Sequence, residues 1–418
     1  MNFTSLTKRV SLFNAYYELT SSTTWQLVAI KGPAWAFGGP GQTYKFSPWI
    51  HLVHFVYIWA FIGSFEKFLK ICLSGHPARQ VMAFSSQRAS SLLLGHGRRI
   101  RFLCSSSSSS FPEHISFIKE VAATQPPQHL SQLLGILNAR GESILSPGAK
   151  QGLMPLAIPL SKSSSGSVTA LLRWPTAPAG MEMPVVEVCK HGVWLLAKNV
   201  DQFIHRILVE VDANSCQNRS DELFHAASDA GDKLYKKGDF SKSGITDIDV
   251  YLLRKVGLFP DVLERKVMQQ FEKGDHVSAL VTGEFYTRKK HFPGFARPFV
   301  FNAQVLLKVG RNLEAKDAAR GALKSPWWTL GCKYHEVACI AEWEDEQIEY
   351  RTKKMTEDGR QEDLNKGKPP FQIALDEAAF LLDLASVEGT WDNSLGQIAE
   401  CYKEAGLHDI ARFLQYKD

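Results

Sequence analysis

The residues with the clearest metal-binding chemistry lie in the sequence HEVAC at positions 335–339. This stretch matches half of the zincin pattern HExxH, but Cys339 stands where the pattern has its second histidine. Cys332, His335 and Cys339 could share one helix face and offer three zinc ligands. No fourth ligand is apparent, and cysteines on buried helix faces are common. The sequence therefore predicts no metal site, with these three residues as its weak candidates.

Three acidic residues on one predicted helix are the other candidates for chemistry. Asp376, Glu377 and Asp383 have the side chains that general acid–base catalysis uses. Their apolar surroundings, IALDEAAFLLDL, predict a packed helix and give no sign of a pocket around them. The chain also has no Gly-rich phosphate loop and no dinucleotide fingerprint. We therefore expect a protein that is not an enzyme and needs no cofactor.

The charge of the chain is divided unevenly along its length. Residues 1–112 carry 11 Lys and Arg against two acidic residues, a balance of +9, which leaves −4 for residues 113–418. A mildly acidic body argues against non-specific nucleic-acid binding. The seven cysteines include no CxxC pair, so neither a disulfide framework nor a four-cysteine zinc site is indicated.

The elements that must position these residues are organised around residues 299–328, which the pattern predicts to form one helical hairpin. Gly310 can take the left-handed backbone that ends a helix, and Pro326 stops the second helix. The small residues between them recur at helical spacing and allow a close helix partner. This spacing is typical of a tetratricopeptide repeat, a unit that stacks on its neighbours. The packing and punctuation residues are Gly310, Ala315, Ala319, Ala322 and Pro326.

Similar turns recur along the second half of the chain. Gly274 lies 36 residues before Gly310, and Gly238 lies another 36 residues before Gly274. A fourth copy contains Gly406. A small residue follows each glycine at the fifth position, namely Ser243, Ala279, Ala315 and Ala411. The sequence thus predicts an all-α, tetratricopeptide-like helical-repeat domain over residues 217–418, with a polar insertion at 345–370. Acidic residues from Glu342 to Glu349 indicate a long exposed helix, and a flexible stretch follows it up to Pro369-Pro370.

A small α+β module is predicted before the repeats, over residues 112–216. Helical patterns cover 113–123 and 129–139, and strand patterns cover 167–174, 184–189 and 192–197. Residues 153–160 contain two prolines, so we expect at best an edge strand there. Residues 200–211 form an amphipathic helical pattern. The loop 176–184 is either a long connection, which we favour, or a mobile partner-binding loop.

The first 110 or so residues are predicted to be disordered or non-globular. Residues 82–111 begin with Met82, lack acidic residues, and contain four arginines and ten serines. That composition is typical of a transit peptide and indicates a chloroplast. Residues 46–65 are uncharged and just long enough to span a membrane. We nevertheless interpret 1–81 as an upstream extension that is not part of the protein, the alternatives being an anchor or a second targeting segment, and expect no anchor in the mature chain.

A basic and aromatic segment, TRKKHFPGFARPF, follows the Gly274 copy at residues 287–299. Such a mixture can bind single-stranded nucleic acid or meet an acidic protein face. Alternatively, the phenylalanines fill the groove between hairpins while the charges stay in water. Together with the tryptophan pair that ends the Gly310 hairpin, it supplies the candidate partner-binding residues: Arg288, Lys289, Lys290, Phe292, Arg297, Trp327 and Trp328.

Three stretches of the chain carry a resemblance to a known family. They are GDKLYKKGDFSKSGITDIDVYLLRKVG (231–257), KSPWWTLGCKYHEVACIAEWEDE (324–346) and the ending SLGQIAECYKEAGLHDIARFLQYKD. Over residues 82–418 the chain is similar to the plant family named for chloroplast ATPase biogenesis. The resemblance implies a stromal protein that assists assembly of the chloroplast ATP synthase catalytic head by acting on its gamma subunit. It implies no catalytic residues. Residues 1–81 depart from the family pattern.

These observations lead to one expected function and two alternatives. We expect a non-enzymatic assembly factor of the chloroplast stroma whose partner is a protein, by resemblance the gamma subunit, and not a nucleic acid. The first alternative is an organellar RNA-binding helical-repeat protein, which requires a basic surface. The second is a general scaffold of the tetratricopeptide type, and a membrane-anchored form of it would use residues 46–65.

Overall fold

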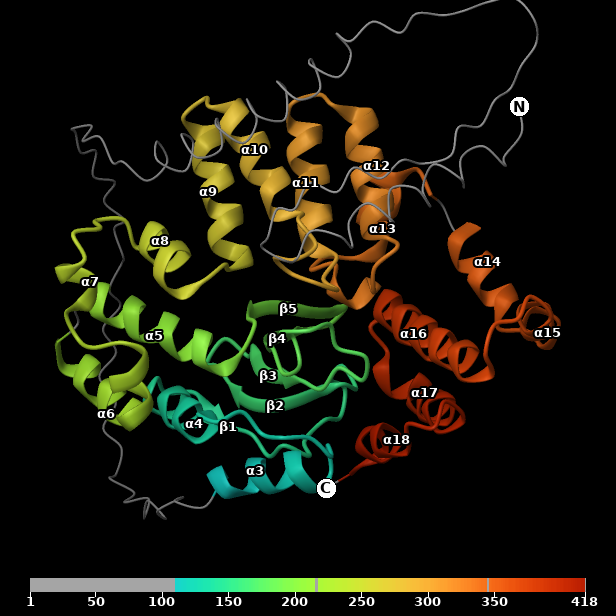
Figure 1. Cartoon of the computed structure of the whole chain (residues 1–418), viewed down its shortest axis with the longest axis horizontal. Helices are drawn as coiled ribbons and strands as arrows, with labels where there is room; N and C mark the ends of the chain where they lie inside the picture. The colour runs from blue at the N-terminus through green and yellow to red at the C-terminus, as the bar shows by residue number, and fades with distance from the viewer. Residues whose placement is uncertain (1–109, 215–216, 344–345, 418) are drawn as a thin grey trace, which may run out of the picture. The chain divides into compact units, whose positions relative to one another are not determined.

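The structure, a computed structural model, describes residues 110–214, 217–343 and 346–417 (Figure 1). The predictions for residues 1–81, including the hydrophobic segment 46–65, lie outside these ranges, as does the predicted transit peptide up to residue 109. No helix in the described ranges is both long enough and apolar enough to cross a membrane.

A small antiparallel sheet followed by many helices forms the described part of the chain, as predicted. The sheet is a meander in which every strand pairs with its neighbours in sequence order. Val, Ile and Leu dominate its central strands, because branched side chains fit a pleated and covered surface. The strands are β1 (Ser143–Ile144), β2 (Ala157–Lys162), β3 (Val168–Leu172), β4 (Val185–Cys189) and β5 (Gly192–Ala197).

Strand β2 differs from the prediction for residues 153–160. It pairs with β1 on one side and β3 on the other, so it is not an edge strand, although β1 has only two residues. Pro155 precedes the strand, and Pro159 sits at a shift of register against β3. The carbonyl of Pro159 lies 3.2 Å from the Nε2 atom of His114. The proline is accommodated because an irregular position does not require its missing N–H group.

Four helices accompany the sheet in the first half of the described chain: α3 (Ser110–Glu120), α4 (Leu130–Ala139), α5 (Val200–Asn214) and α6 (Gln217–Leu234). Helices α4 and α5 contact the strands, and α6 packs against α4 and α5. The apolar face of α4 is fully buried, as its sequence period requires. In the loop 176–184, Met181 is fully buried and Met183 nearly so. These side chains belong to the interior and do not form an exposed binding loop.

The remaining chain is helical and surrounds the sheet on two further sides (Figure 1). Helices α9 to α12 stand next to one another beyond β5, and α16 to α18 lie along another side. The elements are α7 (Asp239–Lys242), α8 (Ile248–Tyr251), η1 (Leu252–Val256), α9 (Pro260–Glu272), α10 (His276–Tyr286), α11 (Arg297–Lys308), α12 (Asn312–Ala322), η2 (Trp327–Thr329), α13 (Tyr334–Ala341), α14 (Glu346–Lys354), α15 (Glu357–Asn365), α16 (Pro370–Glu388), α17 (Trp391–Glu404) and α18 (His408–Gln415).

The turns with glycine join consecutive helices at three places. Gly274, Gly310 and Gly406 have φ angles of +73°, +77° and +80° and connect α9 to α10, α11 to α12, and α17 to α18. The small residues five positions later, Ala279, Ala315 and Ala411, are fully buried. The tetratricopeptide character of these pairs stays a prediction.

The Gly238 copy is built differently from the others. Gly238 also has a positive φ, +87°, but the helix that follows it, α7, has four residues and buries none of them. Ser243 ends that helix instead of packing inside a hairpin. A four-residue helix has too little apolar surface to pack as a repeat unit. No full second helix therefore follows Gly238.

The segment predicted as a polar insertion, 345–370, contains two helices. Helix α14 buries no residue, and α15 buries only Gly359. Thr356 caps α15 by accepting a hydrogen bond from the N–H of Gly359. Lys354 bridges the two helices by ion pairs to Glu362 and Asp363, at 2.9 and 3.0 Å. Charge pairing and capping thus organise a segment that has little apolar surface.

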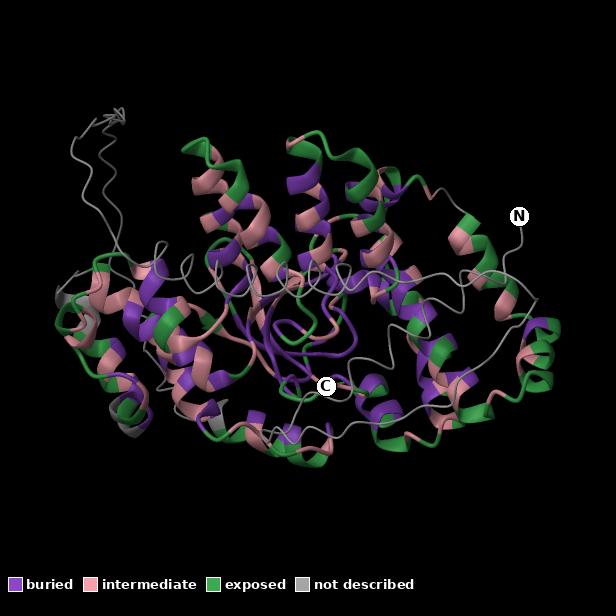
Figure 2. Cartoon of the chain, turned by 45° about the horizontal axis from the view of Figure 1, so that its top comes forward, coloured by how far each residue is buried: buried purple, intermediate pink, exposed green. Residues whose placement is uncertain are grey.

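One hydrophobic core runs from the sheet into the helices. Trp174 on the sheet side packs against Trp328 and Phe295 at ring distances of 5.1 and 5.7 Å. Figure 2 shows buried residues in the strands and on the helix faces turned toward them, and exposed residues at the outer turns of α9 to α12. A second cluster centred on Trp327 and Phe380 joins α11, α12, α13 and α16.

A candidate protein-binding cleft

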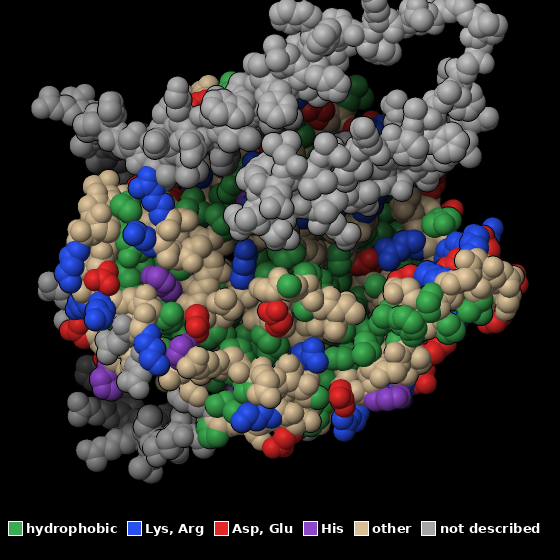
Figure 3. Space-filling view, in the orientation of Figure 1, with side chains coloured by type: hydrophobic (Ala, Val, Ile, Leu, Met, Phe, Trp, Pro, Cys, Tyr) green, Lys and Arg blue, Asp and Glu red, His purple; other side chains and the backbone are tan. Residues whose placement is uncertain are grey.

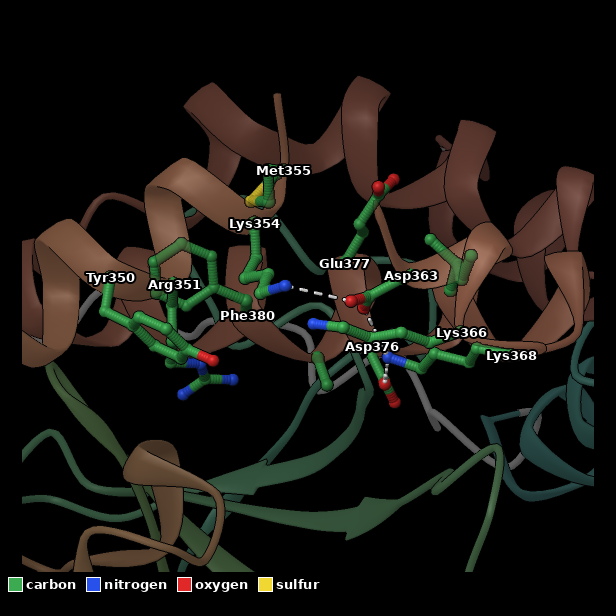
Figure 4. A pocket seen from close by; sticks show the side chains of 12 residues that line it. Tyr350, Arg351, Lys354, Met355, Asp363, Lys366, Lys368, Asp376, Glu377 and Phe380 are labelled. Atoms are coloured by element: carbon green, nitrogen blue, oxygen red, sulfur yellow. Dashed lines mark hydrogen bonds and ion pairs between the residues drawn. The ribbon is translucent and has the colours of Figure 1, made fainter. Parts of the chain in front are cut away.

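A cleft of about 390 Å³ lies between α14, α15 and the first half of α16. We call it the charged cleft, because cations and carboxylates face one another across it (Figure 4). Helices α14 and α15 form one wall, and α16 forms the other. Its lining residues are Tyr350, Arg351, Lys354, Met355, Asp363, Lys366, Lys368, Ile373, Asp376, Glu377, Ala379 and Phe380.

Arg351 holds α14 onto the rest of the chain. Its Nη1 atom donates to Asp383 Oδ2 at 2.8 Å, and the N–H of Trp327 donates to the other oxygen of that carboxylate at 2.7 Å. The guanidinium also lies over the rings of Trp327 and Phe380, at 5.0 and 4.5 Å. Burial raises the pKa of Asp383 to about 6, although Arg351 and the Trp327 N–H favour its charged form.

Paired charges line the mouth of the charged cleft. Lys368 lies 3.1 Å from Asp363 and 2.6 Å from Asp376, and Asp363 also accepts from Lys354. These bonds to lysine lower the pKa of Asp363. The side chains of α14, α15 and α16 therefore hold one another in place across the opening. Figure 3 shows side chains of both charge signs over α14 and α15.

Glu377 is the most unusual carboxylate of the charged cleft. Its Oε1 atom is buried and forms no hydrogen bond, although Arg360 Nε lies 3.3 Å away. Burial raises the pKa of Glu377, and the charge of Arg360 opposes that rise. Arg360 also pairs with Glu404 of α17. One cation of α15 is thus shared between two carboxylates of the C-terminal helices.

A second, more apolar hollow of about 470 Å³ adjoins the charged cleft and shares Tyr350, Arg351 and Ala379 with it. It lies between the sheet, η2 and α16. Its polar residues, such as Lys324 and Gln347, accompany a larger apolar lining. That apolar lining consists of Leu156, Trp174, Leu323, Pro326, Trp328, Leu375, Leu382 and Tyr402.

The two hollows together bring charged and apolar lining residues next to one another. Asp376, Glu377 and Asp383 were predicted to lack a pocket of the kind that a general acid–base pair requires, and the structure places all three at these hollows. Asp376 and Glu377 line the charged cleft, and Asp383 lines the apolar hollow. The cleft was not expected, because the end of α14 and all of α15 fall in the stretch that was predicted to be a flexible insertion after an exposed helix. All three carboxylates have a cation within 4.0 Å.

The predicted partner-binding residues divide into two groups in the structure. Phe292, Trp327 and Trp328 are 3%, 2% and 2% exposed and pack inside the chain. Their rings are buried between the sheet and the helices. Of the three, only Trp328 lines one of these two hollows, as part of the apolar lining described above. Arg297 is half-buried and forms a bidentate ion pair with Glu264, at 2.8 and 2.6 Å. Arg288, Lys289 and Lys290 are exposed.

The weak zinc candidates are not brought together. Cys332 precedes α13, whereas His335 and Cys339 are exposed on that helix. In the described residues, no three His, Cys, Asp or Glu side chains are grouped as a metal ion would require. Burial raises the pKa of the Cys332 thiol to about 11, which disfavours the thiolate that zinc binds.

Sequence reasoning missed the residues that build the charged cleft. Arg351, Lys354 and Asp363 lie in the segment that was expected to be a polar insertion. A usable signal was present, because Thr356 and Glu357-Asp358 mark a helix start and basic residues precede it at the end of α14. The pairing of Arg351 with Asp383, 32 residues later, has no local signal.

Three family models match the chain in order: PAB N-terminal at residues 112–255, PAB middle domain at 260–344, and PAB C-terminal domain at 348–417. The chain is also 66% identical to the Arabidopsis thaliana protein named "Protein IN CHLOROPLAST ATPASE BIOGENESIS, chloroplastic". That similarity extends over 320 residues, 77% of this chain and 94% of the relative. No solved structure matches the chain. The chain therefore belongs to the PAB family, together with this Arabidopsis protein.

Proposed function

We propose that the protein is a non-enzymatic assembly factor for the chloroplast ATP synthase. In this proposal it binds a subunit of the catalytic head, the gamma subunit, in the stroma and promotes its incorporation. The observation that carries the proposal is the 66% identity to a relative whose name refers to chloroplast ATPase biogenesis. At that identity, over nearly the whole relative, a shared role is the simplest interpretation.

The geometry supports protein binding in two ways. The charged cleft and the apolar hollow offer adjoining charged and apolar contacts, the combination that a protein segment needs. The carboxylates of α16 that line them are paired with cations, so none of them is poised as a free general base. We extend the proposal to the repeat architecture and to residues 82–111 as a chloroplast transit peptide.

The proposal is tested by removing the protein from the plant that makes it. We expect the assembled catalytic head, separated by native electrophoresis, to fall severalfold while synthesis of its subunits, measured by pulse labelling, stays unchanged. Return of the full chain should restore the assembled head. A normal amount of assembled head without the protein would refute the proposed function, and reduced subunit synthesis would place the protein at an earlier step.

A further inference from the structure

The connection between α10 and α11 presents three consecutive exposed cations, Arg288, Lys289 and Lys290. Lys198, at the start of the turn between β5 and α5, is half-buried beside the same connection. Its Nζ atom lies 5.4 Å from the ring centre of Phe292. We call these four residues the basic patch. They come from two parts of the chain that are 90 residues apart.

Hydrogen bonds and buried side chains fix the connection that carries the basic patch. The N–H of His291 donates to the carbonyl of Arg288 at 2.8 Å, and the His291 Nδ1 atom lies 2.8 Å from the carbonyl of Phe285. Phe292 and Phe295 are each 3% exposed and anchor the connection in the core. Three exposed cations on a loop with buried anchors need little further ordering to meet a partner.

The cations of the basic patch act together at one point. Burial lowers the pKa of His291, and the charges of Arg288, Lys290 and Lys198 add to this lowering against the hydrogen bond to Phe285, which raises it. Among the described residues, no carboxylate lies within 4.0 Å of the Nζ atom of Lys198, Lys289 or Lys290. Many other cations of the chain, such as Arg206, are paired with a carboxylate. Positive charge is therefore concentrated at these three lysines, which no carboxylate of the described residues pairs at that distance.

We propose that the basic patch is a docking surface for an acidic segment of the partner protein. This inference rests on the proposed function and adds the place and the chemistry of the contact. Residues 113–418 carry a net charge of −4, so a basic patch on this body attracts acidic groups to one place and repels them elsewhere. Charge complementarity of this kind orients two proteins as they meet.

The same geometry disfavours nucleic acid as the occupant. Single-stranded RNA needs exposed aromatic rings for base stacking along a basic groove. Phe292 and Phe295, the aromatic residues next to the cations, are buried against Tyr286 and Trp174. Four cations on a negatively charged body also neutralise few phosphates. The half-buried ring of Phe285 lies beside the Arg288 guanidinium and the His291 ring, at 5.2 and 4.2 Å, so it is already packed. The basic patch thus offers mainly ion pairs to carboxylates.

The experiment compares three variants of the full chain with the unaltered protein. The first reverses the exposed cations, R288E/K289E/K290E. The second reverses three other exposed lysines, K273E/K353E/K417E, and has the same net charge. The third, R288K/K289R/K290R, keeps the charge and changes the side chains. Because all these positions are exposed, we expect every variant to fold, which is checked by circular dichroism.

Binding is measured to each purified subunit of the chloroplast ATP synthase head, the gamma subunit included, and to a single-stranded RNA oligonucleotide. We expect the first variant to lose subunit binding by about tenfold to hundredfold, since each exposed ion pair contributes a factor of up to about five. The second and third variants should bind within about twofold of the unaltered chain. Carbodiimide cross-linking should join Lys289 or Lys290 to an Asp or Glu of the subunit.

The possible outcomes separate this inference from the proposed function. Equal subunit binding by the unaltered chain and the first variant overturns the docking surface and leaves the assembly role standing. Equal loss in the first and second variants also overturns it, because net charge alone would then explain the loss. RNA binding that only the first variant loses assigns the patch to nucleic acid. If the unaltered chain binds no head subunit, the proposed function fails and the inference fails with it.

Discussion

Replacing Arg351 with methionine should destabilise the protein much more at about pH 8 than at about pH 5. Burial raises the pKa of Asp383 to about 6, so this carboxyl group is ionised at the higher pH and protonated at the lower one. At the higher pH the variant leaves a charge that is 95% buried with only the Trp327 N–H as a partner. A folded-state pKa above the ordinary value means that stability is lost as the pH rises through it.

The size of the effect follows from the two roles of Arg351. Breaking a buried ion pair costs about 3–5 kcal/mol, and the 29% exposure of the Arg351 side chain places this pair at the lower end, about 3 kcal/mol. At about pH 5 the charge on Asp383 is gone, and only the contacts with the Trp327 and Phe380 rings are lost. Methionine keeps part of that packing, which leaves a loss of about 1 kcal/mol.

The measurement is urea unfolding of the unaltered chain, R351M, D383N and the double variant at both pH values, followed by tryptophan fluorescence. At about pH 8 the double variant should lose less free energy of unfolding than the two single variants lose in sum, because the Arg351–Asp383 interaction is removed only once. Lys353→Met, an exposed neighbour on α14, is the control and should change the free energy of unfolding by less than about 0.5 kcal/mol. If R351M lost the same free energy of unfolding at both pH values, the charge on Asp383 could not be the cause of the loss.

Two further predictions concern buried contacts. Burial lowers the pKa of Lys150 from 10.5 to about 7, so its contribution to stability is full above pH 10.5 and is lost as the pH falls toward 7. The Phe413 ring, 3.5 Å from Nζ, stabilises the ammonium group and reduces this effect. K150M should therefore flatten the rise in unfolding free energy between about pH 7 and pH 9. An unchanged slope would show that the titration of Lys150 does not cause that rise. At Gly192, with φ of +144°, a Cβ atom would lie 2.0 Å from the Trp328 carbonyl oxygen. G192A should lower the free energy of unfolding, measured by thermal unfolding, by at least about 3 kcal/mol. G166A, where φ is +93° and a Cβ atom would meet open space, should lower it by about 1–2 kcal/mol. Equal losses of unfolding free energy in the two variants would count against the close contact at Gly192.

The part of the fold that sequence could predict is the part with a local period. The apolar spacing of α4 and α5 and the apolar, β-branched runs of β3 to β5 appear directly in the residues. Glycine turns such as Gly310 are recognisable because a left-handed residue after a helix strongly favours glycine. These signals depend only on neighbours within a few residues.

The cleft and the buried tryptophans could not be predicted in the same way, because long-range contacts decide them. Trp327 and Trp328 have the composition of a binding pair, but Phe380 and Trp174 cover them from distant parts of the chain. Polar helices such as α14 have almost no apolar period. The Arg351–Asp383 pair fixes that helix, and a pair 32 residues apart leaves no pattern in the sequence.

The turn between β4 and β5 fixes several helices in place, and this limits the surfaces that a partner can occupy without disturbing the fold. The His191 Nδ1 atom lies 2.9 Å from the carbonyl of Ser386 in α16, and the Trp391 indole N–H donates to the carbonyl of Lys190 at 3.1 Å. Gly192 in the same turn lies against the Trp328 backbone. Because η2, α16 and α17 are all fixed to this turn, moving any of them breaks buried contacts. Helices α14 and α15 bury almost nothing, and the connection carrying Arg288 to Lys290 presents its charges outward. A contact at the basic patch therefore leaves the core undisturbed, whereas moving α14 away from α16 at the charged cleft breaks the buried Arg351–Asp383 pair.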